Sequence, residues 1–300
     1  MKHEIELKLT LAESIIPTIR TWLAQLPTFG YEKQPLENSY YDNAERFFAL
    51  NDIGLRVRKK AQRFEMTLKT GGKTIGGLHI RPEYSVELPN ETPDLQRLAA
   101  AEGLPFQADP NSLQSSLHLL FKTDFIRERW LVVQDLAQIE ICLDQGDITN
   151  SLIKENICEL ALELIEGNPI ELIQLLRTMP IIDGIYFSAL SKVERGYLLN
   201  DAEKASKDVE QLLQADIIER PFICLYQIEQ YIADYLRRLD YHPQLLGKFL
   251  EIHQRYNQQL HFKYDTGKEN WRTVQHFLAS AEYFKYNLNS LERICRENIK

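Results

Sequence analysis

The sequence predicts an α+β fold, in which a closed antiparallel β-barrel with peripheral helices is followed by a small all-α domain. Two observations carry this prediction. Stretches that alternate charged and apolar residues recur through residues 1–200, which also hold eleven of the thirteen glycines, and such alternation is typical of antiparallel strands. From about Ala205 onward, apolar residues instead recur three or four positions apart, as on one face of a helix. We therefore divide the chain into a barrel domain at 1–202 and a helical domain at 203–300.

Several stretches of the first region are predicted to be strands. They are Glu4–Lys8, Ile53–Lys59, Arg63–Lys69, Arg81–Leu88, Phe125–Leu131, Gln138–Asp144 and Ile157–Ile165. Two segments rich in turn residues, Gly71-Gly72 and 144–147, are predicted to be turns at the ends of strands. One helix is expected near Ser14. Two more are expected at Thr92-Pro93 and Asn168-Pro169, because a capping residue followed by proline is typical of a helix start.

The tail is predicted to contain about four helices. Leu225, Ile228 and Ile232 begin a helical stripe of apolar residues, and similar stripes continue through Leu245–Leu260 and Val274–Ile294. The stripes are interrupted at three places where helices are expected to end or begin. These places are Pro221, His242-Pro243 and Asp265–Lys268.

Composition and charge limit the classes of function. The chain has 300 residues and a formal net charge of −8, which disfavours nucleic acid as a partner. The four cysteines lie far apart without a C-x-x-C pair, so we expect free thiols in a reducing cytoplasm. The N-terminal segment has no apolar signal-peptide core, and no run of about 18 apolar residues occurs. We therefore expect neither secretion nor a membrane partner.

The first predicted strand carries its charges on one face. Glu4, Glu6 and Lys8 alternate with apolar residues, so two carboxylates and an ammonium share a face. For a single strand, a solvated outer face explains such a pattern. The pattern recurs, however, with both signs in one strand after another. The further positions are Arg56, Arg58, Glu65, Lys69, Arg81, Glu83, Glu87, Arg127, Arg129, Glu140, Asp144, Glu159 and Glu163.

A barrel built from these strands has a charged lumen. Its apolar faces pack against the outer helices, so the charged faces line the inside. Buried ions without partners are costly, and the lumen must therefore stay wet or bind a ligand that pairs with both signs. A complex of polyphosphate with Mg²⁺ or Mn²⁺ meets this need, because the metal bridges carboxylates to phosphate oxygens while Lys and Arg neutralise the remaining charge. The charge arrangement therefore favours a triphosphate-like substrate.

The segment Glu4-Ile5-Glu6-Leu7-Lys8 resembles the E-x-E-x-K signature of the CYTH superfamily, the triphosphate tunnel metalloenzymes. Further matches follow in order over about two thirds of the chain. They are Tyr40-Tyr41-Asp42, Gly54–Arg58, Thr67–Lys69, Arg127 with Arg129, Ile139–Ile141 with Asp144, Cys158–Leu160, and Ser191-Lys192 with Arg195–Tyr197. Gly77–His79, Arg81–Tyr84, the stretch from Thr123 to Trp130 and Leu143–Gly146 resemble the bacterial inorganic triphosphatase branch. The resemblance implies metal-dependent hydrolysis of inorganic triphosphate to diphosphate and phosphate.

The resemblance also implies roles for individual residues. Glu4, Glu6 and Glu159 are expected to hold the principal divalent ion, Mg²⁺ or Mn²⁺, and Glu140, Asp144 or Glu163 to assist a second ion or orient water. The residues expected to grip phosphate oxygens are Lys8, Arg56, Arg58, Lys69, Arg127, Arg129 and Lys192. The expected catalytic set is Glu4, Glu6, Lys8, Lys69 and Lys192. No protein nucleophile is needed, because metal bridging stabilises charge and orients the attacking water.

Two features depart from the family pattern. The late strand of the family alternates glutamates, whereas Ala161 here stands between Glu159 and Glu163. This change lowers the expected metal affinity or shifts a ligand role onto Glu163. The tail occupies the place of a CHAD helical domain, which is associated with polyphosphate, but its length of about 100 residues is roughly half the usual one. We interpret the tail as a shortened CHAD-like domain, with polyphosphate as a candidate partner.

Several alternative functions are open at this point. Thiamine triphosphatases and class IV adenylate cyclases reuse the same triphosphate grip but need a pocket for an organic group. A noncatalytic polyphosphate-binding module belongs to another class, and Ala161 and the tail favour it. The segment 71–74 imitates the end of a P-loop, but Thr67 stands where the first glycine belongs. The tyrosines of the tail lie at helical spacing, which is more typical of a core than of an RNA-binding surface.

Overall fold

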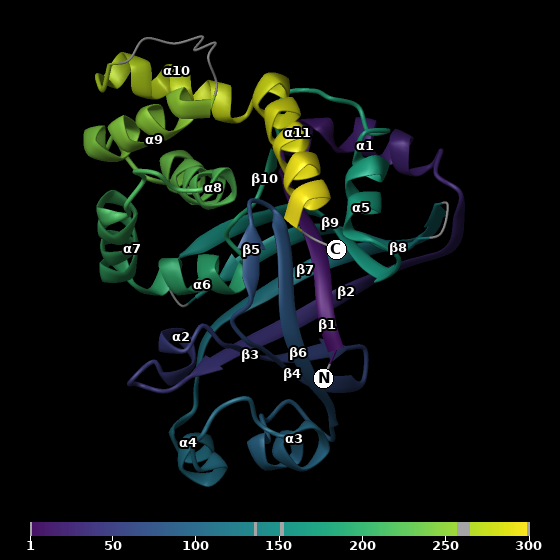
Figure 1. Ribbon diagram of the computed structural model, residues 1–300. Helices are drawn as coiled ribbons and strands as arrows, with labels where there is room; N and C mark the ends of the chain where they lie inside the picture. Colours follow the sequence, from purple (N-terminus) through teal and green to yellow (C-terminus); the bar gives the residue numbers. More distant parts are fainter. Residues whose placement is uncertain (1, 135–136, 151–152, 257–264, 299–300) are drawn as a thin grey trace.

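The computed structural model describes residues 2–134, 137–150, 153–256 and 265–298. Within them, eight strands close an antiparallel barrel in the order β1-β9-β8-β7-β2-β3-β4-β6, and β6 pairs back with β1 (Figure 1). Two further strands, β5 and β10, extend the pairing at β6 and β1. The strands are β1 (Lys2–Leu11), β2 (Thr28–Asp42), β3 (Gly54–Lys60), β4 (Arg63–Lys69), β5 (Lys73–Ile75), β6 (Leu78–Leu88), β7 (His118–Gln134), β8 (Ala137–Thr149), β9 (Lys154–Glu166) and β10 (Ile185–Phe187). The predicted fold class is confirmed.

Every stretch that the sequence predicted to be a strand overlaps an observed strand, but β2, β5 and β10 were missed. β2 escaped prediction because Gly30 and Pro35 interrupt its alternating pattern. Its pairing with β7 nevertheless extends from Thr28 to Asp42, so the tertiary ladder outweighs the weak local preference. β5 and β10 have three residues each, which is too short for an alternating pattern to be recognised.

Both turn predictions in the barrel region were wrong. Residues 144–147 lie inside β8, and a Cβ atom at Gly146 would lie 2.1 Å from the carbonyl oxygen of Asp124 on β7. Glycine is needed there because two backbones approach closely, not because the chain turns. Gly71-Gly72 likewise forms no hairpin turn. The tight turn lies instead at Gly76-Gly77 between β5 and β6, where Gly76 takes a φ of 58°.

Short helices flank the barrel strands. They are η1 (Glu13–Ile15), α1 (Ile16–Leu23), α2 (Phe47–Leu50), α3 (Leu95–Glu102), α4 (Pro110–Ser116), α5 (Pro169–Leu176) and α6 (Lys192–Asn200). The predicted start at Asn168-Pro169 is confirmed, because the Asn168 side chain caps α5. The predicted cap at Thr92 was wrong. Asp94 caps α3 instead, since its carboxylate accepts a hydrogen bond from the Arg97 amide at 2.8 Å.

The described part of the tail contains five helices rather than about four. They are α7 (Ala202–Gln214), α8 (Phe222–Arg238), α9 (Pro243–Tyr256), α10 (Lys268–Leu278) and α11 (Ala281–Asn298). The three predicted interruptions coincide with the starts of α8, α9 and α10, whereas residues 257–260 of one predicted stripe lie outside the described residues. The missed interruption divides the stripe Val274–Ile294. There the Ala281 amide donates to Asp183 at 2.8 Å, a partner 98 residues away that local periodicity cannot reveal.

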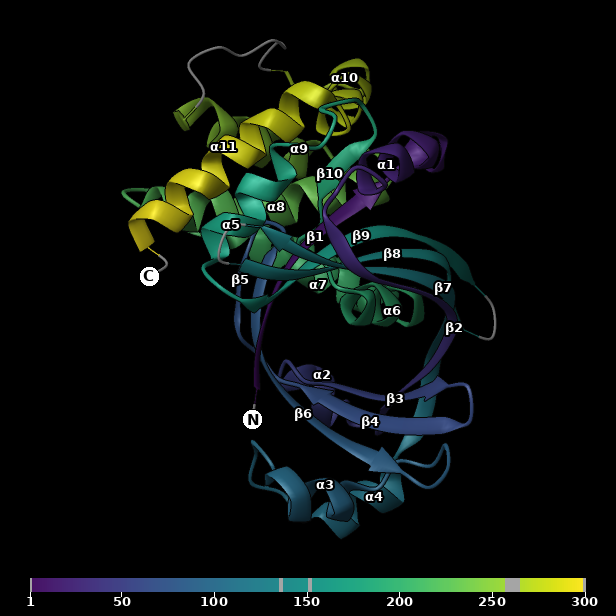
Figure 2. The same ribbon diagram turned by 90° about the vertical axis from the view of Figure 1, so that its right-hand side faces the viewer.

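The tail packs directly against the outside of the barrel (Figure 2). Leu7 and Leu9 of β1 share one hydrophobic core with Phe284 and Leu288 of α11, and the rings of Phe187 and Phe284 stack at 5.3 Å. A second core lies within the tail itself. The division into domains at residues 202 and 203 stays a prediction. Among the described helices, none combines the length and apolar content needed to cross a membrane.

Candidate functional site

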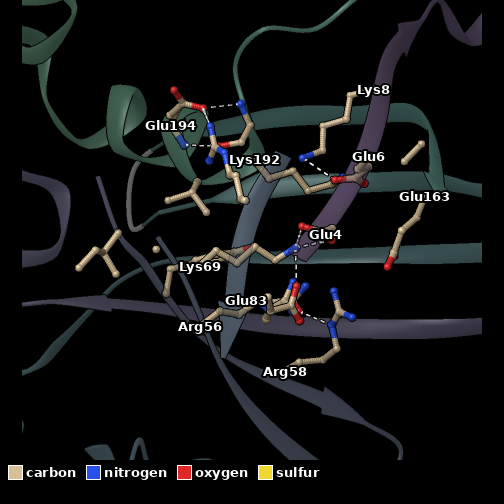
Figure 3. A pocket seen from close by; sticks show the side chains of 18 of the residues that line it. Glu4, Glu6, Lys8, Arg56, Arg58, Lys69, Glu83, Glu163, Lys192 and Glu194 are labelled. Carbon is tan, nitrogen blue, oxygen red and sulfur yellow. Dashed lines mark hydrogen bonds and ion pairs between the residues drawn. The ribbon is translucent and has the colours of Figure 1, made fainter. Parts of the chain in front are cut away.

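The barrel encloses a cavity of about 390 Å³ that charged side chains line from many strands (Figure 3). On β1, Glu4, Glu6 and Lys8 face this cavity, while Leu7 and Leu9 are fully buried in the outer core. The alternation along a strand therefore places charge inside and apolar residues outside. Helix α6 also contributes to the lining, beginning at its N-terminal residue Lys192.

Most of the predicted site residues line this cavity. They are Glu4, Glu6, Lys8, Arg56, Arg58, Lys69, Arg127, Glu140, Glu163 and Lys192. Arg129, Asp144 and Glu159 do not. Arg129 instead bonds Glu140 at 2.6 Å and reaches Glu32 at 3.4 Å, and its side chain is one-third exposed. Asp144 and Glu159 are buried and bond to Lys192.

Glu6 of β1 lies opposite Glu163 of β9 in the antiparallel register. Two carboxylates in this arrangement repel each other unless cations lie nearby. Lys8 Nζ lies 2.7 Å from Glu6 Oε2. Burial by itself would raise the pKa of Glu6, but Lys8, Lys69 and Lys192 outweigh it and hold that pKa well below its usual range. Glu6 is therefore ionised at neutral pH.

Lys69 of β4 joins a carboxylate of β6 and a carboxylate of β1, the next two strands of the barrel wall (Figure 3). Its Nζ lies 2.6 Å from Glu4 Oε1 and 3.1 Å from Glu83 Oε2. Burial would lower the pKa of Lys69, but the negative charges of Glu4, Glu83 and Glu6 raise it instead. The lysine therefore keeps its charge and neutralises part of the acidic wall formed by β1 and β6.

The part of the cavity wall formed by β3 is cationic. Arg58 Nε donates to Asn38 Oδ1 at 2.9 Å, and Arg56 Nη2 donates to Thr67 Oγ1 at 3.1 Å. Arg56 Nε is buried and has no hydrogen-bond partner among the described residues. Burial, together with the charges of Arg56 and Arg127, lowers the pKa of Arg58 to about 9. Such crowded guanidinium groups favour a bound anion, which would relieve their mutual repulsion.

Lys192 stands at the start of α6, where Ser191 and Glu194 form a capping box. Its ammonium contacts Asp144 Oδ2 at 3.0 Å and bonds Glu159. Burial would lower the pKa of Lys192, but these two carboxylates raise it. Asp144 and Glu159 are almost completely buried and act here as partners of cations.

The residues present fit an oxygen-loving divalent ion by their donor chemistry. Glu4, Glu6 and Glu163 all line the cavity and offer the carboxylate oxygens that Mg²⁺ and Mn²⁺ prefer. In the conformation of the described residues, no three acidic, histidine or cysteine side chains are gathered to hold an ion. Ala161 lines the cavity opposite Lys8 and supplies no oxygen donor.

Several lining residues were not predicted from the sequence to belong to the site. Asn38 and Tyr40 come from β2, which was not predicted as a strand. Phe125 lies close to two cations, because Lys192 Nζ is 5.5 Å and the Arg127 guanidinium carbon 5.6 Å from its ring centroid. Phe125 shares the inner face of β7 with Arg127, two residues further on, and this spacing was the signal available in the sequence.

The inorganic triphosphatase of Haemophilus influenzae is 40% identical over 205 residues, which are 68% of this chain and 56% of that protein. The chain thus spans little more than half the length of this curated relative. A solved structure from Hippeastrum, described as an adenylyl cyclase with a dominant triphosphatase activity, has a TM-score of 0.46 and 19% identity over 65% of this chain and 96% of that one. A solved structure of a Pyrococcus horikoshii protein has a TM-score of 0.40 and 20% identity, and the match covers 65% of this chain and 98% of that one.

A sequence model of one domain covers most of the region that builds the barrel. The CYTH domain model matches residues 2–197, from β1 into α6. This span contains every lining residue from the strands as well as Lys192. The chain therefore belongs to the CYTH family.

Proposed function

We propose that the chain is a metal-dependent triphosphatase that hydrolyses inorganic triphosphate to diphosphate and phosphate. The crowded cations on one wall of the cavity carry this proposal. Arg56 and Arg58 are half-buried side by side on β3, Arg56 Nε is buried without a hydrogen-bond partner among the described residues, and the pKa of Arg58 is lowered to about 9 by desolvation and by like charge. A compact polyanion relieves this repulsion. The relative that is 40% identical is named as an inorganic triphosphatase, which supports the same substrate class.

We further propose that Glu4, Glu6 and Glu163 hold Mg²⁺ or Mn²⁺. When bound, such an ion neutralises phosphate oxygens and the charge that develops during phosphoryl transfer. Lys8 and Lys69 now bond Glu6 and Glu4, and in this mechanism they shift to phosphate oxygens when the substrate enters. In this proposal the two lysines offset the charges of Glu6 and Glu4 before the substrate enters and then bind the substrate.

The arginines and Lys192 bind the remaining phosphate oxygens in this proposal. Arg56, Arg58 and Arg127 present guanidinium groups to the cavity, and these suit two-point bonding to phosphate. Lys192 lines the same cavity from α6. Because the strands and helix α6 hold these groups in place before substrate binds, catalysis rests on positioning and electrostatic stabilisation rather than on a protein nucleophile.

Four predicted site residues receive other roles in this proposal. Both oxygens of Glu159 accept hydrogen bonds, from Lys192 and Arg195, so we assign it to the support of Lys192. Asp144 supports Arg127, because its Oδ1 accepts a hydrogen bond from Arg127 Nε at 2.7 Å. Glu140 and Arg129 bond each other at 2.6 Å at the edge of the cavity. We therefore leave these four out of the metal-binding and phosphate-binding sets.

A noncatalytic polyphosphate-binding module is the second candidate function, and Ala161 favours it because one inward position lacks a carboxylate. The cytoplasm fits either function, since all four cysteine thiols are free. Polyphosphate binding by the tail stays a prediction, as does the absence of nucleic-acid and membrane partners.

A substrate panel tests the proposal. Phosphate release from tripolyphosphate, thiamine triphosphate and ATP is measured with Mg²⁺, with Mn²⁺ and with a chelator, and cyclic AMP is assayed in parallel. We expect metal-dependent turnover of tripolyphosphate. The double variant Glu4→Gln/Glu6→Gln should lose it while keeping the circular dichroism of the fold. Glu87→Gln, an exposed change on β6 outside the cavity, is the matched control. Tight tripolyphosphate binding without turnover in either metal would favour the binding module.

A further inference from the structure

We propose that Arg238 of the tail helix α8 is a positioning residue for Lys192. It acts through Glu155 and Arg195 on Glu159, the carboxylate that bonds the Lys192 ammonium. By this inference the tail contributes to the phosphate-binding site from outside the cavity. The inference rests on the proposed function in so far as Lys192 binds phosphate.

A series of side chains of alternating charge, each bonded to the next, connects the cavity with the tail. Beginning at the cavity, Lys192 of α6 bonds Glu159 of β9, and Glu159 in turn accepts a hydrogen bond from Arg195, one turn further along α6. Arg195 Nε donates to Glu155 Oε1 at 2.6 Å. Glu155, at the start of β9, accepts from Arg238 Nη1 at 2.9 Å through its other oxygen. The series thus passes from α6 to β9, back to α6, back to β9, and then to α8.

Burial makes the inner part of this series sensitive to its outer part. Glu159 is 2% and Arg195 is 4% exposed. Buried charges are tolerated only when their partners are held in good geometry. All three nitrogens of the Arg195 guanidinium group are engaged, because Nη2 also donates to the Asn156 carbonyl oxygen at 2.6 Å. A shift of Glu155 therefore turns the guanidinium and moves its contact with Glu159.

Arg238 is well suited to hold Glu155. Both of its terminal nitrogens bond the carboxylate, one to each oxygen, and such two-point bonding fixes orientation as well as distance. Its neighbour Arg237 donates to the Leu278 carbonyl oxygen at 2.9 Å and stacks on the Tyr186 ring at 4.1 Å. The end of α8 is therefore anchored both to β10 and to the rest of the tail.

A second contact supports the same role for α8. Asp234, one turn before Arg238, accepts hydrogen bonds from the amides of Ala189 and Leu190 at 2.8 and 3.0 Å. These two residues directly precede Ser191 and Lys192, where α6 begins. Helix α8 thus holds the backbone that leads into Lys192 as well as the side chains around its ammonium.

The experiment compares Arg238→Gln and Arg238→Lys in the full chain. The first readout is the rate of acetylation of Lys192 by a small amine-reactive ester, followed by mass spectrometry. Lys192 is 13% exposed in the structure, so its acetylation should be slow. We expect Arg238→Gln to speed it by about fivefold, within the range seen for coupled neighbours. Arg238→Lys keeps the charge and should restore part of the protection.

Controls separate positioning from general loosening of the fold. Lys69, on a different wall, and Lys207, on the tail surface, should be acetylated at unchanged rates in the same samples. Arg220→Gln breaks an exposed ion pair of the tail with Asp216 and should change nothing. Equal acceleration at Lys69 and Lys192 would mean that Arg238 only stabilises the fold, and would overturn the inference.

The second readout is the Kd for tripolyphosphate in the presence of chelator, measured by titration calorimetry. Arg238→Gln should weaken binding by about fivefold in the wild-type background and much less in a Lys192→Gln background, because coupled residues are not additive. Equal weakening in both backgrounds, or an unchanged acetylation rate of Lys192, would overturn the inference. If acetylation changes as expected but the wild-type chain neither binds nor hydrolyses tripolyphosphate in the presence of Mg²⁺ or Mn²⁺, the positioning role stands and the proposed function fails.

Discussion

Glu6 on β1 and Glu163 on β9 are direct antiparallel neighbours, and both face the cavity. The next inward pair is Lys8 and Ala161. One acidic pair therefore lies beside a position where the carboxylate of the family pattern is missing. This relationship locates the proposed metal-binding carboxylates at one seam of the barrel, where β1 meets β9.

Restoring a carboxylate at this seam should strengthen metal binding. In Ala161→Glu the new side chain enters the cavity beside Glu163 and adds an anionic oxygen donor, which raises the affinity for hard cations. We expect the Mg²⁺ or Mn²⁺ concentration for half-maximal tripolyphosphate hydrolysis to fall by about threefold or more. Ala161→Gln adds similar bulk without the charge. If both variants shift the metal requirement equally, charge is not the cause.

Asp42 should be a strong determinant of stability. Its carboxylate is fully buried and accepts hydrogen bonds from the amides of Phe48 and Ala49, at 2.9 and 3.0 Å, and from the Tyr197 hydroxyl at 2.9 Å. Asp42→Asn replaces one accepting oxygen with a donor, so the free energy of unfolding should fall by about 2–3 kcal/mol in urea titrations. Tyr197→Phe removes one bond and should cost about 1 kcal/mol. Equal stability of wild type and Asp42→Asn would contradict this role.

Glu155 should make stability depend on pH in the acid range. Burial would raise the pKa of Glu155, but the hydrogen bond from Arg238 and the charge of Arg195 lower it below 4.5. A carboxylate with a lowered pKa stabilises the fold above its unfolded pKa, and this contribution is lost as the pH falls through the folded pKa. The stability difference between wild type and Glu155→Gln should therefore be largest near neutral pH and shrink as the pH falls below about 5.

Urea unfolding across this pH range checks the Glu155 prediction. Glu203→Gln is the matched control, because Glu203 is 81% exposed in an ion pair of the tail surface. Its difference from wild type should stay small at every pH. A constant difference for Glu155→Gln over the whole range would mean that the ionised carboxylate does not contribute through its lowered pKa.

Gly146 should tolerate no side chain. A Cβ atom there would lie 2.1 Å from the Asp124 carbonyl oxygen, so Gly146→Ala forces β7 and β8 apart. We expect a loss of about 3 kcal/mol or more in the free energy of unfolding, as for other overpacked interiors. Gly247→Ala is the control. Gly247 lies within helix α9, and a Cβ atom added there would lie 3.4 Å from its nearest neighbour, Thr266 Cγ2. The substitution should therefore raise the free energy of unfolding by up to about 1 kcal/mol. Thermal and urea unfolding measure both changes.

Much of the fold could be predicted because alternation along a strand is a local property. The spacing of Glu4, Glu6 and Lys8 determines that they share a face, whichever strands lie beside them. The same reasoning placed Arg56 and Arg58 on an inner face, where the structure has them. The helices of the tail could also be predicted from their spacing of apolar residues. The exception is the break before α11, where the Ala281 amide bonds Asp183, a residue outside the tail.

The sequence by itself determined that many strands carry charge of both signs on one face, because this follows from residues two positions apart. Only the tertiary structure decided which carboxylate meets which cation. Glu159 is buried and does not line the cavity, because its oxygens bond Lys192 and Arg195, which lie more than thirty residues further along the chain. The register between distant strands and the docking of α6 and α8 set these pairings. Such contacts form only when the barrel closes, so no local pattern encodes them.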